Sequence, residues 1–486
     1  MNLSKKQEYL IIAGLLVLIF PFFALLAYVH PQGDDFFFAY KMQSQGVFDF
    51  VKEMYFTWSG RYSSMFLGAI DPFAYNSIFG LRFSLVLLQL FTIFSIFLLV
   101  KSITTKKTSL TKLLIATLSF YIVFINSTIS LFEFVFWYPV ASAYQLAVAL
   151  ITIFLSLVLF ENQNRLSVNI FLFLTAVVIF ITIGLIELSI IPLGIISVLN
   201  IWANIKLKKN FYPSIVIVVI IIGFSLLMIL APGNYIRHDM IGNTINIKLS
   251  ITLSIQMAIY TIGYLFQNPV FVLSSILFIS FTFLKIKNNQ SFSITIPRIK
   301  PWLIFLSSFV IIIFIFLPSV LILKHLPPSR VINFVSYFIM IIWVFDIVLI
   351  VNYYKNTFSF SIQKGVVSIL VATTVIFSFS GVIIIDKNEF AHGNYKSIYF
   401  NGNIVKAYYI LLFEAGKHDN HMNKRDAIIR NARKNGKAGV QIYPFKHNTS
   451  LINFINLNET NYSFNWEAKY YNLDSIYIEP RKKQSP

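Results

Sequence analysis

Long apolar runs recur along the first 385 residues of the chain. Eleven runs of close to twenty residues each contain few charges, at positions 10–29, 81–100, 113–130, 144–160, 168–184, 188–205, 213–230, 264–285, 302–323, 331–352 and 366–385. At a rise of ~1.5 Å per residue, a helix of this length crosses the ~30 Å hydrocarbon core of a bilayer. The pattern predicts an all-α polytopic membrane protein with about eleven transmembrane helices.

One break between spans follows from length alone. Between Val168 and Ile205 the only charged residue is Glu187. A single helix over these 38 residues would be ~57 Å long, nearly twice the thickness of the hydrocarbon core. The segment must therefore fold back, and Glu187 is expected at the turn between two spans, at a face of the membrane.

Basic residues in short loops set the expected orientation. Lysines and arginines precede the first span and follow the second, fourth and sixth, and the positive-inside rule assigns these positions to the cytoplasm. To keep the basic cluster at 285–300 on that side, segment 244–262 is expected to be interfacial or re-entrant. The run 10–29 is expected to stay uncleaved as the first span. The N-terminus is then cytoplasmic, and the C-terminus lies outside.

The last hundred residues have the composition of an ordinary soluble domain. This change divides the chain into a transmembrane domain, residues 1–385, and an extracytoplasmic C-terminal domain, residues 386–486. Within the second part, 423–435 predicts a basic helix and 440–443 predicts a short strand. We therefore expect a small mixed α/β domain after the membrane body.

Composition and charge narrow the function classes. The chain is 57% hydrophobic and 12% charged, with 39 basic and 20 acidic residues, whereas soluble domains average roughly 25% charged residues. Much of the positive charge lies beside spans, where it sets topology and attracts anionic lipid headgroups. Nucleic acid is therefore not an expected partner. Because the chain has no cysteine, disulfides, thiolate catalysis and cysteine metal sites are excluded.

The first outer loop, residues 30–80, opens with two adjacent carboxylates, Asp34 and Asp35. Near lipid such groups are partly desolvated, which raises the pKa and makes one of them a candidate proton acceptor. The alternative is that Asp35 is the N-cap of a helix that begins at Phe36. Two short interfacial helices, over 36–40 and 47–56, are expected after the pair.

The outer loops also supply cations and an amide. These candidate substrate-binding residues are Arg61, Asn234, Arg237, Lys324 and Arg330. The Pro-Gly pair ahead of Asn234 predicts a tight turn that presents Asn234 and Arg237 outside any helix. Guanidinium groups can hold a phosphate through two hydrogen bonds. Arg61 could also pair with an acidic residue, or anchor the chain at the membrane interface. The alternative for the other three cations is a structural ion pair with Glu133, Glu187 or the Asp34-Asp35 pair.

The sequence lacks the motifs that mark common active sites of soluble enzymes. It holds no zinc motif, no phosphate-binding glycine loop and no nucleophile elbow. No metal site is predicted, although a divalent cation is left open as a cofactor. His418 and His421 flank Asp419, which leaves a choice there between a metal site and a solvated loop.

Several landmarks together resemble a known class of enzymes. They are Asp34-Asp35, Trp58-Ser59-Gly60-Arg61-Tyr62, Glu187 in an outer turn, Ala231 to Arg237, Arg425 to Ile429, Val440 to Pro444 and Trp466 to Tyr471. A long first outer loop that opens with Asp-Asp on a many-span body resembles the GT-C class of integral-membrane glycosyltransferases, and the landmarks resemble a bacterial family within it. One departure is Ile186, which stands where that family is expected to have a histidine beside Glu187.

The resemblance implies an enzyme of the bacterial cytoplasmic membrane. It would take a sugar from a polyprenyl-phosphate donor at the outer leaflet and transfer it to an extracytoplasmic glycan or lipid acceptor. Asp34 or Asp35 would act as the base on the acceptor hydroxyl, and Arg237 and Arg330 would hold the phosphate leaving group. The remaining candidate substrate-binding residues are Arg61, Glu187, Asn234 and Lys324.

A second function class fits the same hydropathy. A transporter or flippase for a lipid-linked or anionic substrate would also need many spans. Transporters tend to carry internal repeats and broken helices that meet at the membrane midplane. This chain shows no clear repeat between its halves, and its candidate residues gather on one expected face, which favours the enzyme.

Overall fold

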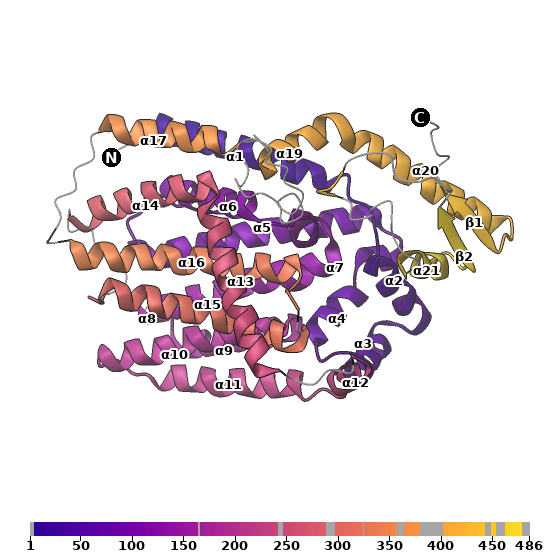
Figure 1. The fold of residues 1–486 in the computed structure, drawn as a ribbon, viewed down its shortest axis with the longest axis horizontal. Coiled ribbons are helices and arrows are strands. Elements are labelled where there is room, and N and C mark those ends of the chain that lie inside the picture. The colour runs from indigo at the N-terminus through magenta and orange to yellow at the C-terminus, as the bar shows by residue number, and fades with distance from the viewer. Residues whose placement is uncertain are drawn as a thin grey trace.

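The computed structural model describes most of the chain. It covers residues 4–163, 166–241, 246–287, 297–323, 325–355, 357, 364–379, 402–442, 449–452 and 462–478. Within these ranges the chain forms a bundle of long helices, and its C-terminal elements lie along one side and one end of that bundle (Figure 1).

Ten helical segments among the described residues are long and apolar enough to cross a membrane. Nine of these segments contain the helices α1 (Lys5–Leu26), α5 (Ile78–Ile103), α6 (Leu110–Ser127), α8 (Leu146–Asn162), α9 (Val168–Leu185), α10 (Ile190–Lys206), α11 (Tyr212–Ile229), α15 (Pro301–Leu323) and α16 (Ser329–Tyr354). The tenth segment is a helix at Ile247–Phe266, and the shorter apolar helix α14 (Pro269–Lys287) follows it. Large apolar side chains such as Phe173 and Val219 are exposed on the bundle, as lipid-facing residues are. The chain is therefore a helical multi-pass membrane protein.

The predicted spans and the observed helices agree closely. Nine of the eleven predicted runs coincide with helices long enough to span. The run at 264–285 corresponds to α14, whose apolar part is the shorter stretch Pro269–Phe283. The run at 366–385 corresponds in part to α17 (Lys364–Phe377), a helix of 14 residues.

The tenth candidate span is one that the charge argument did not predict as a span. Segment 244–262 was expected to be interfacial or re-entrant, but residues Ile247–Phe266 form one continuous helix, α13. Its neighbours are α14, α15 and α16, and Figure 1 shows it running across them rather than along them. The re-entrant alternative is wrong, because the helix does not turn back.

The predicted break between two spans is confirmed. Helix α9 ends at Leu185, Ile186 is extended, and Glu187–Ser189 form a short 3-10 turn, η4, ahead of α10. A charged side chain is costly in the apolar interior of a span. The turn places Glu187 after the end of α9 and before the start of α10. The length argument therefore located this residue correctly.

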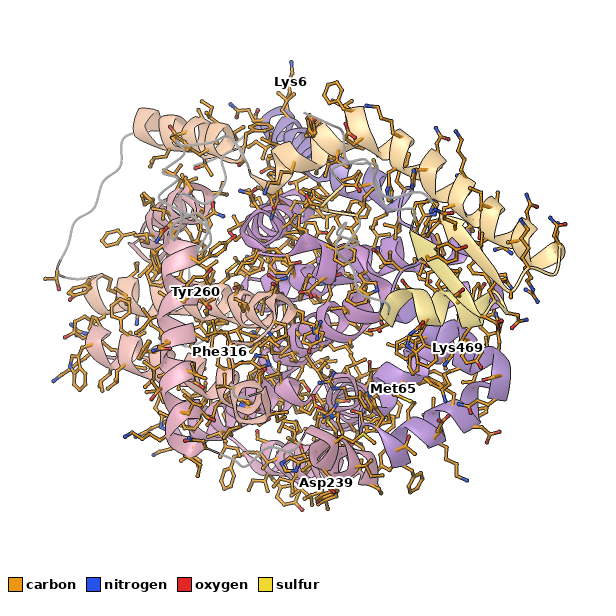
Figure 2. The ribbon with its side chains drawn as sticks, turned by 45° about the vertical axis from the view of Figure 1, so that its right-hand side comes forward. Lys6, Met65, Asp239, Tyr260, Phe316 and Lys469 are labelled. Atoms are coloured by element: carbon orange, nitrogen blue, oxygen red, sulfur yellow. The ribbon has the colours of Figure 1, made fainter. Side chains whose placement is uncertain are left out.

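Short helices gather at one end of the bundle. They are α2 (Asp34–Gln45), α3 (Val47–Thr57), α4 (Tyr62–Ala69), the 3-10 turn η1 (Pro72–Tyr75) and α12 (Pro232–Ile241). We call this end the loop face (Figure 1). In Figure 2, Met65 of α4 lies between Asp239 of α12 and Lys469 of the C-terminal segment, so the loop face extends from one to the other.

The expected short helices of the first loop are confirmed as α2 and α3. Gly46 separates them with a φ of 83°, a left-handed conformation that favours glycine. On α3, Phe50 and Met54 are buried against Phe38 of α2, whereas Phe48 is 83% exposed. Burial of one apolar side fixes α3 against α2 and α4, and it leaves Phe48 outside that contact.

The C-terminal segment continues the same core. It consists of α19 (Asn403–Tyr409), the π-helical turn η5 (Ile410–Glu414), α20 (Ala415–Lys434), β1 (Gly439–Ile442), α21 (Tyr462–Tyr470) and β2 (Ser475–Ile478). The two strands pair in parallel, with Gly439 opposite Ser475. Ile404 and Ile429 belong to the same buried apolar cluster as Phe124 in the bundle. The predicted helix and strand are confirmed, although the helix begins earlier, and Tyr443 lies outside the described residues.

Ion pairs hold this segment in place. Arg425 of α20 and Glu467 of α21 pair at 2.5 Å, and both side chains are buried. Trp466 packs against Phe37 of α2 with ring centroids 4.8 Å apart. Helix α21 therefore joins α20 to the helix that carries the two candidate aspartates.

His418 and Asp419 lie within α20 and not in a loop. His418 is buried, and Oδ1 of Asp419 is 2.8 Å from Nη2 of Arg82 on α5 and 2.9 Å from Nε2 of His30. The solvated-loop alternative is therefore wrong. In the described part of the chain these side chains form no metal-ligand cluster, and their contacts fix α20 to the ends of α1 and α5.

Candidate functional site

Asp34 and Asp35 form the first turn of α2. Gly33 precedes them with a φ of 56°, again in the left-handed region. The helix begins at Asp34 and Gly33 is its N-cap residue, so the alternative in which Asp35 caps a helix starting at Phe36 is wrong. Instead, Oδ2 of Asp35 accepts a hydrogen bond of 2.8 Å from the backbone N–H of Gln32. This bond closes the turn that leads from α1 into α2.

Asp35 lies near a second buried carboxyl group, Asp71. Only 2% of Asp35 and 1% of Asp71 are exposed. Burial raises the pKa of Asp35, and the negative charge of Asp71 raises it further. Burial also raises the pKa of Asp71 to about 7, against the opposing effect of the backbone N–H of Phe73. Because two close carboxylates in a buried site do not ionise together readily, this pair retains a proton at mildly acidic pH.

Asp71 is the site residue that sequence reasoning missed. An aspartate before a proline is typical of a helix cap, and Asp71 does cap η1, accepting a 2.9 Å hydrogen bond from Phe73 N–H. The local sequence around Asp71 therefore gives no sign of a functional role beyond that of a helix cap. Only the packing of α2 against η1 brings it near Asp35.

Asp34 differs from Asp35 in being partly exposed. Burial raises the pKa of Asp34, and the positive charge of Arg330 acts in the opposite direction. Arg330 lies in the first turn of α16, and its Nη1 is 3.5 Å from Oε1 of Glu133. The ion-pair alternative is therefore confirmed for Arg330, with Glu133 as its partner, and the charge of the same guanidinium also acts on Asp34.

A second charged group is built around Glu187. Arg61 donates from Nε to both carboxylate oxygens of Glu187, at 3.0 and 2.9 Å, and its Nη2 lies 2.8 Å from Oε2. Nη2 of Arg237 lies 3.6 Å from Oε1 of the same carboxylate. Tyr144, which is buried, also interacts with Arg61. The structural ion pair is thus confirmed for Arg61 and for Arg237.

The charges of this second group do not cancel. Two guanidinium groups face one carboxylate, which leaves a net positive charge in a partly buried place. Burial lowers the pKa of Arg237, and the charge of Arg61 lowers it further, against the pull of Glu187. Guanidinium groups stay protonated in proteins and carry five N–H donors each. Arg61, Arg237 and Glu187 therefore form a cationic site in which guanidinium N–H groups can also bind an anion.

Asn234 has a structural role. The expected turn at Pro232–Gly233 is wrong, because residues 232–241 form helix α12, and Asn234 and Arg237 both lie on it. Oδ1 of Asn234 accepts a 3.1 Å hydrogen bond from the backbone N–H of Gly60, and its Nδ2 donates to the carbonyl of Met228 at 2.8 Å. Asn234 therefore joins α12 to the turn before α4 that carries Arg61.

Two glycines allow this close contact. A Cβ on Gly60 would lie 2.0 Å from the carbonyl oxygen of Met228, and a Cβ on Gly233 would lie 2.4 Å from the backbone nitrogen of Trp58. Real side chains do not tolerate either distance. The Trp-Ser-Gly-Arg and Pro-Gly-Asn landmarks of the sequence are therefore two halves of one backbone contact, which places Arg61 beside Arg237.

The structure forms two charged groups from the predicted residues. Asp34 lies near Arg330 in the first, and Glu187 is shared by Arg61 and Arg237 in the second. Among the described residues, no ion pair joins either aspartate to Arg237. Lys324, the other predicted cation, lies outside the described residues.

The site offers no preformed metal centre in the part of the chain that the structure describes. Across those residues, no three His, Asp or Glu side chains converge closely enough to hold a metal ion. The negative charges of Asp34 and Asp71 each act on the carboxyl group of Asp35.

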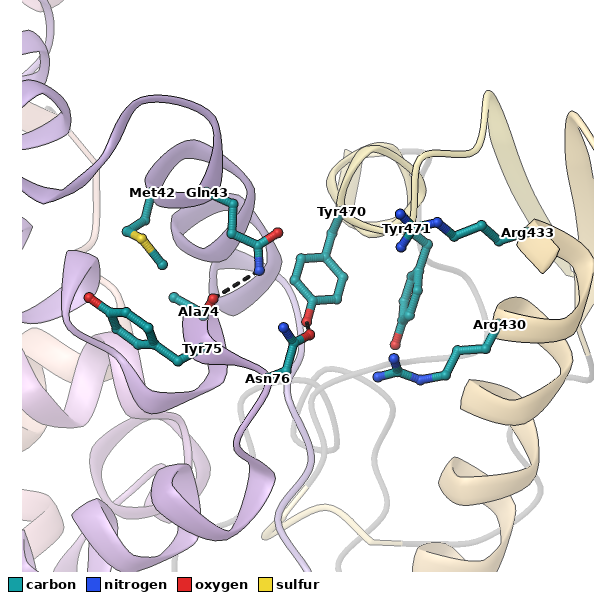
Figure 3. A pocket seen from close by; sticks show the side chains of 9 residues that line it. All are labelled: Met42, Gln43, Ala74, Tyr75, Asn76, Arg430, Arg433, Tyr470 and Tyr471. Atoms are coloured by element: carbon teal, nitrogen blue, oxygen red, sulfur yellow. Dashed lines mark hydrogen bonds between the residues drawn. The ribbon is translucent and has the colours of Figure 1, made fainter. Parts of the chain in front are cut away.

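A cavity of about 620 Å³ opens on the loop face at a different place. Figure 3 shows it between η1 and the C-terminal helices. Its lining residues are Met42, Gln43, Ala74, Tyr75, Asn76, Arg430, Arg433, Tyr470 and Tyr471. Asp34, Arg330 and Glu187 are not among them, so this cavity is distinct from both charged groups.

Comparisons with known proteins give no relative from which a role could be transferred. No protein-family model, no curated protein and no solved structure matches the chain. The GT-C resemblance therefore depends on the sequence landmarks alone.

Proposed function

We propose that the chain is a membrane glycosyltransferase that uses a polyprenyl-phosphate-linked sugar. The observation that carries the proposal is that the positive charge of Arg330 acts on the carboxyl group of Asp34 at the start of α2. Such a transfer needs a base for the acceptor hydroxyl and a cation for the phosphate that leaves. Asp34 and Arg330 supply both groups at one end of a helical bundle.

Asp34 is the better base of the two adjacent aspartates. It is partly exposed, whereas Asp35 is 2% exposed and hydrogen-bonded to Gln32. Burial raises the pKa of Asp34, which strengthens it as a proton acceptor. Asp35 then positions the start of α2. The negative charge of Asp71 favours retention of a proton by the buried Asp35–Asp71 pair.

The proposed step is a displacement at the anomeric carbon. The acceptor hydroxyl gives its proton to Asp34 as its oxygen bonds to the anomeric carbon. The bond from that carbon to the phosphate oxygen breaks, and polyprenyl phosphate leaves with the bonding electrons. Arg330 would stabilise the charge that develops on the phosphate. The Arg61–Glu187–Arg237 group would bind a second anionic part of the donor or acceptor.

The proposal requires a definite orientation. The loop face and the C-terminal segment would lie outside the cytoplasmic membrane of a bacterium, with the N-terminus in the cytoplasm and with lipid and glycan acceptors within reach. Basic residues at the opposite loops support this orientation. A tag fused after residue 486 should be labelled from outside intact cells, and labelling only after lysis would contradict it.

The test uses the full chain in proteoliposomes with a radiolabelled polyprenyl-phosphate sugar. Asp34→Asn should reduce sugar transfer by about 100-fold or more, since a positioned base contributes roughly 10²–10⁴-fold. Asp49→Asn is the matched control, because Asp49 lies exposed on α3 and outside both charged groups. Wild-type transfer by Asp34→Asn would refute the proposed base.

The same experiment separates the transferase from the alternative of a transporter or flippase. Movement of the labelled lipid across the bilayer without sugar transfer would support transport. The two charged groups lie at helix ends on the loop face and not along the middle of the spans. This position favours chemistry at a membrane surface over transport through the midplane.

A further inference from the structure

The cavity at the junction of the bundle and the C-terminal segment has a chemistry of its own. One wall is formed by α2 and η1, and the opposite wall by α20 and α21 (Figure 3). Arg430 and Arg433 enter it from α20, and none of the nine lining residues is acidic. We propose that this cavity binds the phosphate headgroup of an anionic membrane lipid.

The arginines are held for such a contact. Arg430 pairs through Nε with Asp426 at 2.7 Å, and its guanidinium lies over the ring of Tyr471, 5.5 Å from the centroid. Tyr471 also hydrogen-bonds to Asp426. One carboxylate thus orients Arg430, and it leaves a net positive charge where Arg433 reaches the same opening. Basic pockets of this kind suit lipid phosphates.

Neutral donors complete the opposite wall. The hydroxyl of Tyr470 hydrogen-bonds to Oδ1 of Asn76 at 2.6 Å, and Nε2 of Gln43 donates to the carbonyl of Ala74 at 2.8 Å. The first bond fixes the two walls of the cavity relative to each other, and the second joins α2 to η1 within one wall. The amide of Asn76 keeps N–H donors that could reach a headgroup oxygen.

The place of the cavity in the fold indicates that the phosphate belongs to a lipid. Tyr75, which lines it, is 57% exposed, and the span α5 begins three residues later at Ile78. Phe79, in the first turn of that span, is 78% exposed and stacks on Phe83 with ring centroids 6.1 Å apart. An exposed tyrosine at the end of a span marks the headgroup level of a bilayer, and the exposed phenylalanines continue from it along the apolar span. The cavity therefore opens where headgroups lie, with an apolar surface beside it for acyl chains.

The binding test uses the full chain in detergent, titrated with phosphatidylglycerol or phosphatidylcholine and followed by native mass spectrometry. Phosphatidylglycerol should bind more tightly. Arg430→Gln/Arg433→Gln should weaken its binding about 25-fold, since each cation near an anionic headgroup contributes about five-fold. The matched control is Lys434→Gln/Lys437→Gln, which removes the same charge from exposed positions that do not line the cavity. It should change binding less than about two-fold.

Further arms decide between the remaining outcomes. Arg433→Gln alone keeps the Arg430–Asp426 pair, and it should weaken binding about five-fold even if the double variant folds poorly. Phe79→Ser should weaken phosphatidylglycerol binding and leave binding of inorganic phosphate unchanged. Equal losses in the arginine and lysine variants, or equal affinity for the two lipids, would overturn the site. Displacement of bound lipid by millimolar inorganic phosphate would overturn the lipid as its source.

Discussion

Replacing Glu467 by glutamine should release α21 from the rest of the protein. The carboxylate is paired with Arg425 at 2.5 Å, and the exposed fractions of the two side chains are 7% and 4%. The glutamine side chain would keep the shape of the glutamate but remove the negative charge that faces a buried guanidinium. Removing one partner of a buried pair costs about 3–5 kcal/mol. The local opening equilibrium of α21 should therefore rise by a factor of roughly 200 to 5,000.

Hydrogen exchange measures this opening directly, which matters because a many-span protein does not unfold in two states. Backbone amides of α21 (Tyr462–Tyr470) should lose protection in the Glu467→Gln variant, while those of α9 stay protected. The surface pair of Lys41 and Glu53, whose side chains are 25% and 35% exposed, provides the comparison. Glu53→Gln should cost less than about 1 kcal/mol.

A double replacement separates charge from packing. Arg425→Met/Glu467→Leu removes both buried charges and keeps apolar volume, so it should recover most of the lost protection, as such replacements of buried ion pairs often do. If Glu467→Gln reduced the amide protection of α21 no more than Glu53→Gln reduces the protection around residue 53, the argument that the buried pair holds the segment would be refuted.

Two further predictions concern the site. Gly60→Ala and Gly233→Ala should each lower the melting temperature of the purified protein by several degrees, because an added Cβ meets backbone atoms at 2.0 and 2.4 Å. Gly223→Ala is the control and should not lower it, because no atom lies within 4 Å of its added Cβ. An equal effect of all three substitutions would contradict the close-contact argument. Burial raises the pKa of Asp71 to about 7, so the folded state binds this proton more tightly than the unfolded chain, and stability should fall as pH rises from about 4 through 7. Asp71→Asn should flatten that part of the melting temperature profile, and an unchanged slope would contradict the assignment.

The spans were predictable because the bilayer sets a length that sequence must match. The break at Glu187 followed from the same length and is confirmed. The re-entrant alternative at 244–262 was wrong for a different reason. There the charge rule was used to decide whether a segment spans, although it reports the side on which loops lie and not the path of a helix. Helix α13 crosses its neighbours, a geometry that hydropathy does not encode.

Most of the individual residues of the candidate site were predictable from the sequence, but the contacts between them were not. Arg61 and Glu187 are both unusual residues beside apolar runs, but only the fold shows that they bind each other. At 232–241 the Pro-Gly pair was interpreted as a turn. Proline is also favoured in the first turn of a helix, where its missing N–H is not needed, and Pro232 begins α12 in this way. Asp71 had no local signal, because its partner Asp35 comes from another helix.

The contact between Gln32 and Ile452 has a consequence for biosynthesis. Nε2 of Gln32 donates to the carbonyl of Ile452, 420 positions later in the sequence, and Trp466 covers Phe37 from a similar distance along the chain. While the ribosome is still making the spans, these surfaces of the first loop have nothing to pack against. A protein cut before residue 402 should therefore insert into the membrane but leave α2 open to proteases, and quality control would recognise it as unfinished.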